Sequence, residues 1–158
     1  MNKIIKNEMK LEFLSKSNNE AFARIAVACF ASQIDPTIEE VADIKTSVSE
    51  AVTNAIIHAY PNGDGIVKIV SKLYEDEIEI EISDTGIGIS DIEEAKEPLY
   101  TTKSGLERSG MGFTIMESFM DSMKVESIVG LGTKVTLVKT IKKQEEQEEE
   151  TLSSLTKE

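Results

Sequence analysis

A strict alternation of charged and apolar side chains runs through residues 77–83, which read Glu-Ile-Glu-Ile-Glu-Ile-Ser. Such an alternation indicates a β-strand that turns one side to water and the other to a core. A second strand-like run covers residues 66–73, and a polar turn at 74–76 separates the two. Tight turns join antiparallel strands, and a sheet with one wet face carries its helices on the other. The pair predicts an α+β protein with an antiparallel or mixed sheet rather than a doubly wound one.

Other elements are expected on both sides of this pair. In chain order they are a strand at 8–14, a helix opened by a capping box of Ser17 and Glu20, a long helix from about Pro36 with Asp35 as N-cap to near Tyr60, a short helical piece at 92–96, a helix beginning at the Gly110–Gly112 motif, and strands at 123–129 and 133–140.

The first of these helices has an apolar stripe at helical spacing. Its expected core residues are Phe22, Ile25, Ala26, Cys29 and Phe30. Arg24 lies off this stripe, which predicts an exposed and solvated side chain.

The length of 158 residues suffices for one domain with its own core, expected over residues 1–141. Residues 142–158 are acidic and of low complexity, which predicts a disordered tail.

A net charge of −12 argues against direct contact with nucleic acid or an anionic membrane. A nucleotide stays compatible, because Mg²⁺ and a few basic side chains can neutralise it. A single cysteine and the lack of a signal or membrane-spanning segment predict a cytoplasmic protein.

Glu50 and Asn54 lie four residues apart in the long helix, so they share one of its faces. The carboxylate can act as a general base, and the amide oxygen can bind a hard cation such as Mg²⁺. A solvated polar face is the simpler interpretation, and this helix taken alone favours it.

Two glycine motifs further along the chain add a candidate ligand site. Asp84-x-Gly86-x-Gly88 follows the alternating strand, where the carboxylate can accept a hydrogen bond from a base amino group. Taken alone, this glycine pair favours an ordinary bulge and turn. Gly110-x-Gly112 opens a helix, whose N-terminus favours phosphate. Between the motifs, residues 90–107 predict a functional loop or lid. Neither motif has the Rossmann or Walker A spacing.

The order of these motifs resembles the N, G1, G2 and G3 boxes of the Bergerat-fold ATPases and kinases, with Gly130-x-Gly132-Thr133 as the last box. The resemblance covers residues 9–140 and implies a two-layer α/β sandwich. The amino-acid sequences of residues 49–58, 98–103 and 107–117 are similar to those of the sporulation anti-sigma F factors of endospore-forming bacteria. General-stress anti-sigma kinases resemble the chain less well, because their first glycine box is commonly degraded. The acidic tail departs from the family pattern.

This resemblance implies a homodimeric serine protein kinase that uses ATP and Mg²⁺, phosphorylates an anti-anti-sigma factor and also sequesters a sigma factor of the sigma-F type. Glu50 would be the catalytic base and Asn54 the Mg²⁺ ligand, while Asp84 would bind adenine beside Thr133. Arg24 would contact the partner protein, with Thr53 on the same surface. The implied nucleotide-binding residues are Asn54, Asp84, Gly86, Gly88, Thr101, Thr102, Lys103, Arg108, Ser109, Gly110, Met111, Gly112, Phe113 and Thr133.

Two alternatives remain open. The chain could be a binding module in which ATP only sets a conformation competent to hold a sigma factor. It could also be a catalytic ATP-binding domain related to histidine kinases or to general-stress anti-sigma kinases. His58 completes the N box, but a packed structural histidine is the favoured interpretation.

Overall fold

The computed structural model describes residues 3–97, 111–142 and 144–156. These residues form a five-stranded sheet in the order β1-β2-β3-β5-β4, and each strand pairs antiparallel with its neighbours. The strands are β1 (Asn7–Leu14), β2 (Ile66–Leu73), β3 (Glu77–Asp84), β4 (Ser122–Ile128) and β5 (Gly132–Thr140). The expected α+β class is confirmed, and of the two sheet types left open the antiparallel one is observed.

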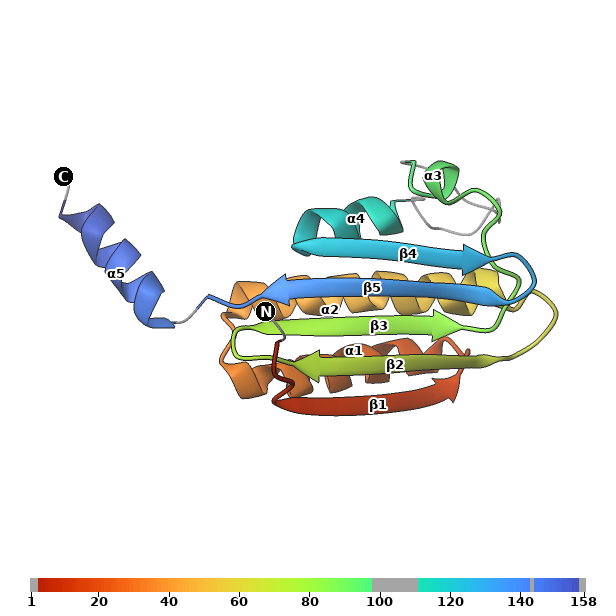
Figure 1. Ribbon diagram of the computed structural model, residues 1–158, viewed down its shortest axis with the longest axis horizontal. Helices are drawn as coiled ribbons and strands as arrows, with labels where there is room; N and C mark the ends of the chain where they lie inside the picture. The colour runs from red at the N-terminus through yellow and green to blue at the C-terminus, as the bar shows by residue number, and fades with distance from the viewer. Residues whose placement is uncertain (1–2, 98–110, 143, 157–158) are drawn as a thin grey trace.

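The helices form a second layer on one face of this sheet (Figure 1). That layer consists of α1 (Asn18–Ala31), α2 (Ile38–Asn54) and α4 (Gly112–Phe119). Short elements complete the domain, namely a 3₁₀ turn at Ser32–Ile34, a π-helical turn, η2, at Ala55–Ala59 that continues α2, and α3 (Ile92–Ala95).

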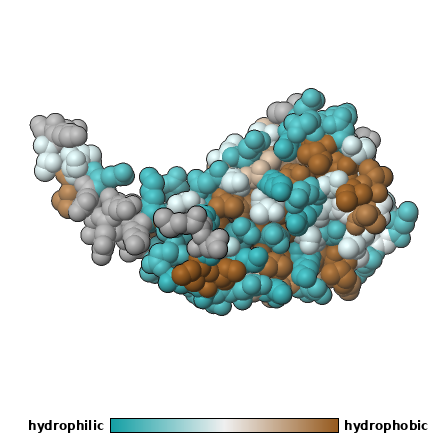
Figure 2. Space-filling view, viewed as in Figure 1, coloured by the Kyte–Doolittle hydropathy of each residue, from teal (hydrophilic) through white to brown (hydrophobic). Residues whose placement is uncertain are grey.

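Burial in the sheet follows the alternation. Ile78, Ile80 and Ile82 of β3 are at most 3% exposed, and they lie against the helices. The glutamates between them point to the opposite face, which is largely hydrophilic in Figure 2. The prediction of one wet and one covered face is therefore confirmed.

The predicted core face of α1 is wrong. Phe22 and Ile25 are 55% and 57% exposed, and Cys29 is exposed as well. The buried stripe is instead Ala23, Val27 and Ala31, with Phe30 as the one large predicted side chain that is buried. Apolar residues surround α1 on most sides, so periodicity does not single out one face. Small side chains let α1 approach α2 closely, which explains why this stripe packs inward.

The predicted helix caps need two corrections. Ser17 precedes α1, but its side chain makes no capping hydrogen bond. The capping box lies at α2, where Thr37 Oγ1 accepts from Glu40 N at 3.1 Å and Glu40 Oε1 accepts from Thr37 N at 2.9 Å. Asp35 has φ 54° and closes the preceding 3₁₀ turn, so α2 begins at Ile38.

The acidic tail contains one helix in the described residues. Residues Gln144–Leu155 form a helix, α5, that projects away from the sheet and its helices (Figure 1). Its sequence is rich in Glu and Gln, which favour helix even without a buried face. Among the helices of the described ranges, none is long and apolar enough to span a membrane.

Candidate functional site

Glu50 and Asn54 lie half-buried on one face of α2, close to its end. The helix continues directly into the π-helical turn at Ala55–Ala59. Such turns are rare and occur frequently at functional sites. His58 lies half-buried within this turn.

The start of α4 faces this pair directly. A Cβ atom added to Gly112 would lie 3.1 Å from Asn54 Nδ2 and 3.1 Å from Glu50 Oε2. The first turn of a helix has unpaired N–H groups and the positive end of the helix dipole. The structure therefore places a carboxylate, an amide and an anion-binding helix end at one point.

Asp84 ends β3 and lies opposite Thr133 of β5. Its Oδ1 accepts hydrogen bonds from Gly86 N at 2.9 Å and from Thr133 N at 3.3 Å. Burial raises the pKa of this carboxyl above its ordinary value, and the two backbone hydrogen bonds oppose that shift. Within the described part of the chain, Oδ2 accepts no hydrogen bond, so this oxygen is available to the N–H group of a ligand.

The Asp84–Gly88 loop packs tightly against its surroundings at both glycines. A Cβ at Gly86 would lie 2.2 Å from Ala59 O, and one at Gly88 would lie 2.5 Å from Ile128 O. Gly88 also has φ +76°, a conformation that favours glycine. These glycines are therefore required for the close approach of this loop to the neighbouring backbone.

Tyr60 fastens the same loop to the end of the long helix. Its hydroxyl accepts from Thr85 N at 2.8 Å and donates to Ile66 O at 2.6 Å. Ile87 N donates to Ala59 O at 2.9 Å. The loop carrying Asp84 and the helix carrying Glu50 are thus held as one unit, and sequence reasoning assigned no role to Tyr60.

Ser127 of β4 is a second residue that sequence reasoning missed. Its Oγ lies 2.8 Å from Thr133 Oγ1 and accepts from Ile89 N at 2.7 Å. Ser127 lies on the same side of β4 as Met123 and Val125, which pack against the core. A polar residue on this inward side was the signal in the sequence that could have identified it. Ser127 orients Thr133 beside Asp84.

The remaining predicted nucleotide-binding residues fall into two groups. Met111 is the N-cap of α4, and the Phe113 side chain is buried in the core, so its backbone amide is the part that can reach a ligand. Thr101, Thr102, Lys103, Arg108, Ser109 and Gly110 lie outside the described residues, as does most of the predicted lid.

Arg24 is half-buried against α2, where the sequence predicted a solvated side chain. Its Nε lies 3.8 Å from Glu20 Oε1, and Glu20 accepts a hydrogen bond from Ser49 of α2. Thr53 is 8% exposed, and its hydroxyl donates to Ser49 O at 2.7 Å. Arg24 therefore presents a guanidinium beside the Glu50 helix, whereas Thr53 leaves little surface for a partner.

The residues around Asn54 suit Mg²⁺ better than a fully coordinated structural metal. Among the described residues, no group of three or more His, Cys, Asp or Glu side chains can hold a metal ion. Mg²⁺ in phosphate-transfer sites is bound by few protein ligands together with phosphate oxygens and water. An amide oxygen beside a phosphate-binding helix end fits that set.

Comparison with known proteins agrees with this arrangement. Residues 15–139 match the family model described as a histidine kinase-like ATPase domain. A crystal structure of the RsbU and RsbW domains of a Mycobacterium tuberculosis protein shares the fold, with a TM-score of 0.62 and 17% identity over 86% of this chain and 33% of that one. The chain belongs to the histidine kinase-like ATPase family, which implies that it binds ATP.

Curated relatives narrow the family further. The anti-sigma F factor of Clostridium acetobutylicum is 59% identical over 136 residues, which are 86% of this chain and 95% of the relative. Those of Clostridium beijerinckii and Clostridium perfringens are each 60% identical over 134 residues, 84% of this chain and 94% and 96% of the relatives. Within the ATPase family, the chain belongs to the anti-sigma F factors.

Proposed function

We propose that the protein is an ATP-dependent serine protein kinase that also binds and inhibits a sporulation sigma factor of the sigma-F type. The observation that carries the kinase activity is the position of Gly112, directly against Glu50 and Asn54. This arrangement brings a base, a cation ligand and a phosphate-binding helix end together.

The roles follow from the chemistry of each group. Asp84 Oδ2 accepts the adenine amino group, with Thr133 beside it. The amides at Met111–Phe113 would hold the phosphates, and Asn54 would hold Mg²⁺, which when bound would neutralise charge on the phosphates. Glu50 accepts the proton of a serine hydroxyl on the anti-anti-sigma factor as that oxygen attacks the terminal phosphate of ATP. The products are phosphoserine and ADP.

Partner binding is proposed from the relatives' names together with the position of Arg24. The relatives are anti-sigma F factors, which supports a sigma factor as the partner. Arg24 lies on α1 beside Glu20, half-exposed and adjacent to the nucleotide helix. We expect this guanidinium to contact the sigma factor, and its position beside the nucleotide helix supports an effect of nucleotide on partner binding. We expect the active form to be a homodimer.

The test of the kinase is Glu50→Gln with labelled ATP and the anti-anti-sigma protein. Loss of a general base lowers transfer by about 10²–10⁴-fold. Because Glu50 does not hold the nucleotide, we expect the ATP dissociation constant to change by less than about threefold, roughly 0.7 kcal/mol.

Asn54→Ala is the matched control on the same face, and it should weaken Mg²⁺-dependent ATP binding. Equal loss of ATP affinity in both variants would contradict the division of roles. The labelled product also separates the alternatives, because phosphoserine survives acid whereas phosphohistidine does not. An acid-labile product would point to a histidine kinase.

A further inference from the structure

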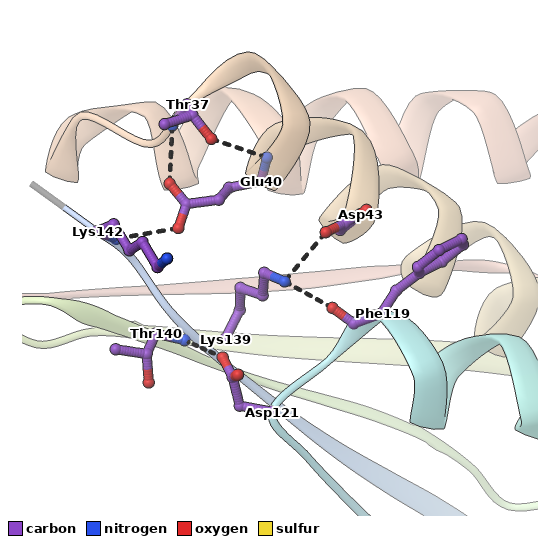
Figure 3. A network of polar contacts seen from close by, with 8 residues as sticks. All are labelled: Thr37, Glu40, Asp43, Phe119, Asp121, Lys139, Thr140 and Lys142. Carbon is purple, nitrogen blue, oxygen red and sulfur yellow. Dashed lines mark hydrogen bonds and ion pairs between the residues drawn. The ribbon is translucent and has the colours of Figure 1, made fainter. Parts of the chain in front are cut away.

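Lys139 joins three elements at the end of the domain remote from Asp84. Its Nζ donates to Asp43 Oδ2 of α2 at 3.1 Å and to the Phe119 carbonyl, the last of α4, at 2.7 Å (Figure 3). The side chains of Lys139 and Asp43 are only 13% and 21% exposed. We call these contacts of Lys139, Asp43 and Phe119 the Lys139 bridge.

The bridge caps the C-terminus of α4. The last turn of α4 contains no basic residue of its own. The carbonyls there are unpaired within the helix and lie at the negative end of its dipole, so a cation is stabilising. Lys139 supplies that cation from β5.

Helix geometry relates the bridge to the ATP site. Asp43, Glu50 and Asn54 are spaced by seven and four residues, so they fall within about 40° of one another on a single face of α2. The distance along α2 from Asp43 to Glu50 is about 10.5 Å, the same as that along α4 from Phe119 to Gly112. The two helices pack together. Helix α4 therefore runs along this face, with its C-terminus at Asp43 and its N-terminus at Glu50 and Asn54.

We propose that Lys139 and Asp43 are positioning residues for phosphate binding, an inference that rests on the proposed function. The bridge sets the position of α4 along α2 and thereby the position of the Gly112 backbone over Glu50 and Asn54. The tolerance there is small, because a Cβ on Gly112 would already lie 3.1 Å from both side chains.

A contact between α2 and the segment that follows β5 provides a control. Glu40 lies one turn before Asp43 and accepts from Thr37 N at 2.9 Å and Lys142 N at 3.0 Å (Figure 3). It fastens the segment after β5 to α2, and among the described residues its carboxylate accepts hydrogen bonds from Thr37 and Lys142 rather than from α4. Loss of this contact should lower stability and leave the phosphate site in place.

The experiment compares Lys139→Met with Glu40→Gln in the full-length protein. For Lys139→Met we expect the KM and the dissociation constant for ATP to rise about tenfold, with a smaller fall in kcat, because phosphate binding is disturbed and Glu50 remains. For Glu40→Gln we expect ATP binding within about twofold of the wild type despite a lower Tm. Lys139→Arg, which keeps a cation at the carbonyl, should restore most of the affinity.

Amide hydrogen exchange provides a readout that does not depend on nucleotide. Exchange at residues 112–116 of α4 should be faster in Lys139→Met than in Glu40→Gln. Equal exchange and equal ATP affinity in these two variants would overturn the positioning role. A wild-type protein that does not bind ATP would instead refute the proposed function, while the exchange difference would still report on α4. If Lys139→Met fails to fold, Asp43→Asn replaces it with the same expected signs.

Discussion

At the residue scale, Asp84 keeps one carboxylate oxygen available as a hydrogen-bond acceptor for a ligand. One carboxylate oxygen accepts two backbone hydrogen bonds, while the other has no hydrogen-bond partner in the described part of the chain. Burial raises the pKa of this carboxyl, because the surroundings solvate its ionised form poorly. The proposed role of Asp84 as an acceptor for adenine explains why this cost to stability is kept.

Replacing Asp84 by Asn should separate stability from binding. The raised pKa means that the native state binds more protons than the unfolded state, so stability falls as pH rises from the ordinary pKa of 3.8 through the raised pKa. Asp84→Asn removes that penalty, so the Tm of the nucleotide-free protein should rise at neutral pH. This gain in Tm should vanish below the ordinary pKa of 3.8, where the carboxyl is protonated in both states. Calorimetry should show ATP affinity weakened by about 10–100-fold, since a hydrogen bond to a charged group is lost.

The wild-type protein makes the matching prediction in its pH profile. ATP affinity should fall as pH falls through the raised pKa of Asp84, because the protonated oxygen no longer accepts from adenine. A profile that is the same in wild type and Asp84→Asn would exclude Asp84 as the adenine acceptor.

At the element scale, α4 is short and has a distinct contact at each end. Gly112 begins it against Glu50 and Asn54, and Phe119 ends it at Lys139. Phe113 and Met116 hold its middle in the core. A helix of eight residues has little stability of its own, so these tertiary contacts determine where it lies.

Gly112→Ala tests the phosphate end of this helix. Alanine favours helix over glycine by up to about 1 kcal/mol, so the Tm should not fall greatly. The added methyl group would displace the Glu50 and Asn54 side chains by a few tenths of an ångström. We expect ATP affinity to fall about tenfold or more by titration calorimetry.

Ser118→Ala is the control on the same helix, since it lies on the exposed side of the last turn. It should leave ATP affinity unchanged. Normal ATP binding in Gly112→Ala would show that the close approach at Gly112 is not needed.

At the scale of the whole molecule, the sheet and the helix layer present surfaces of different character. The open face of the sheet is largely hydrophilic (Figure 2), while the helix layer carries the proposed ATP site and Arg24. The outer side of α1 also exposes Phe22, Ile25 and Cys29, which the sequence had suggested as core. The proposed partner surface therefore lies on the helical side.

Arg24→Glu tests that surface. The reversal sets two carboxylates four residues apart on α1, at a cost of only about 0.5 kcal/mol. We expect the variant to lose capture of the sigma factor in a pull-down with ATP, while its ATP affinity stays within about twofold of the wild type. Lys10→Glu makes the same charge change on the exposed sheet face and should bind normally. Capture by both variants would refute the role of Arg24.

Much of the fold was predictable because its local signals are strong. The alternation in β3 determined which side of that strand is buried, and helical spacing placed Glu50 and Asn54 on one face. The order of the glycine motifs sufficed for the family, which the curated relatives confirm. These properties depend on neighbours along the chain, where the periods of strand and helix hold in any context.

Other properties depended on partners distant in the chain. Periodicity could not choose between the stripe of Ala23 and Val27 and that of Phe22 and Ile25, because the choice depends on how closely α2 approaches α1. Asp84 meets Thr133 because β5 inserts between β3 and β4 in the sheet. Lys139 reaches Asp43 across 96 residues. Such contacts depend on which surfaces pack together in space, and local sequence patterns carry no information about that packing.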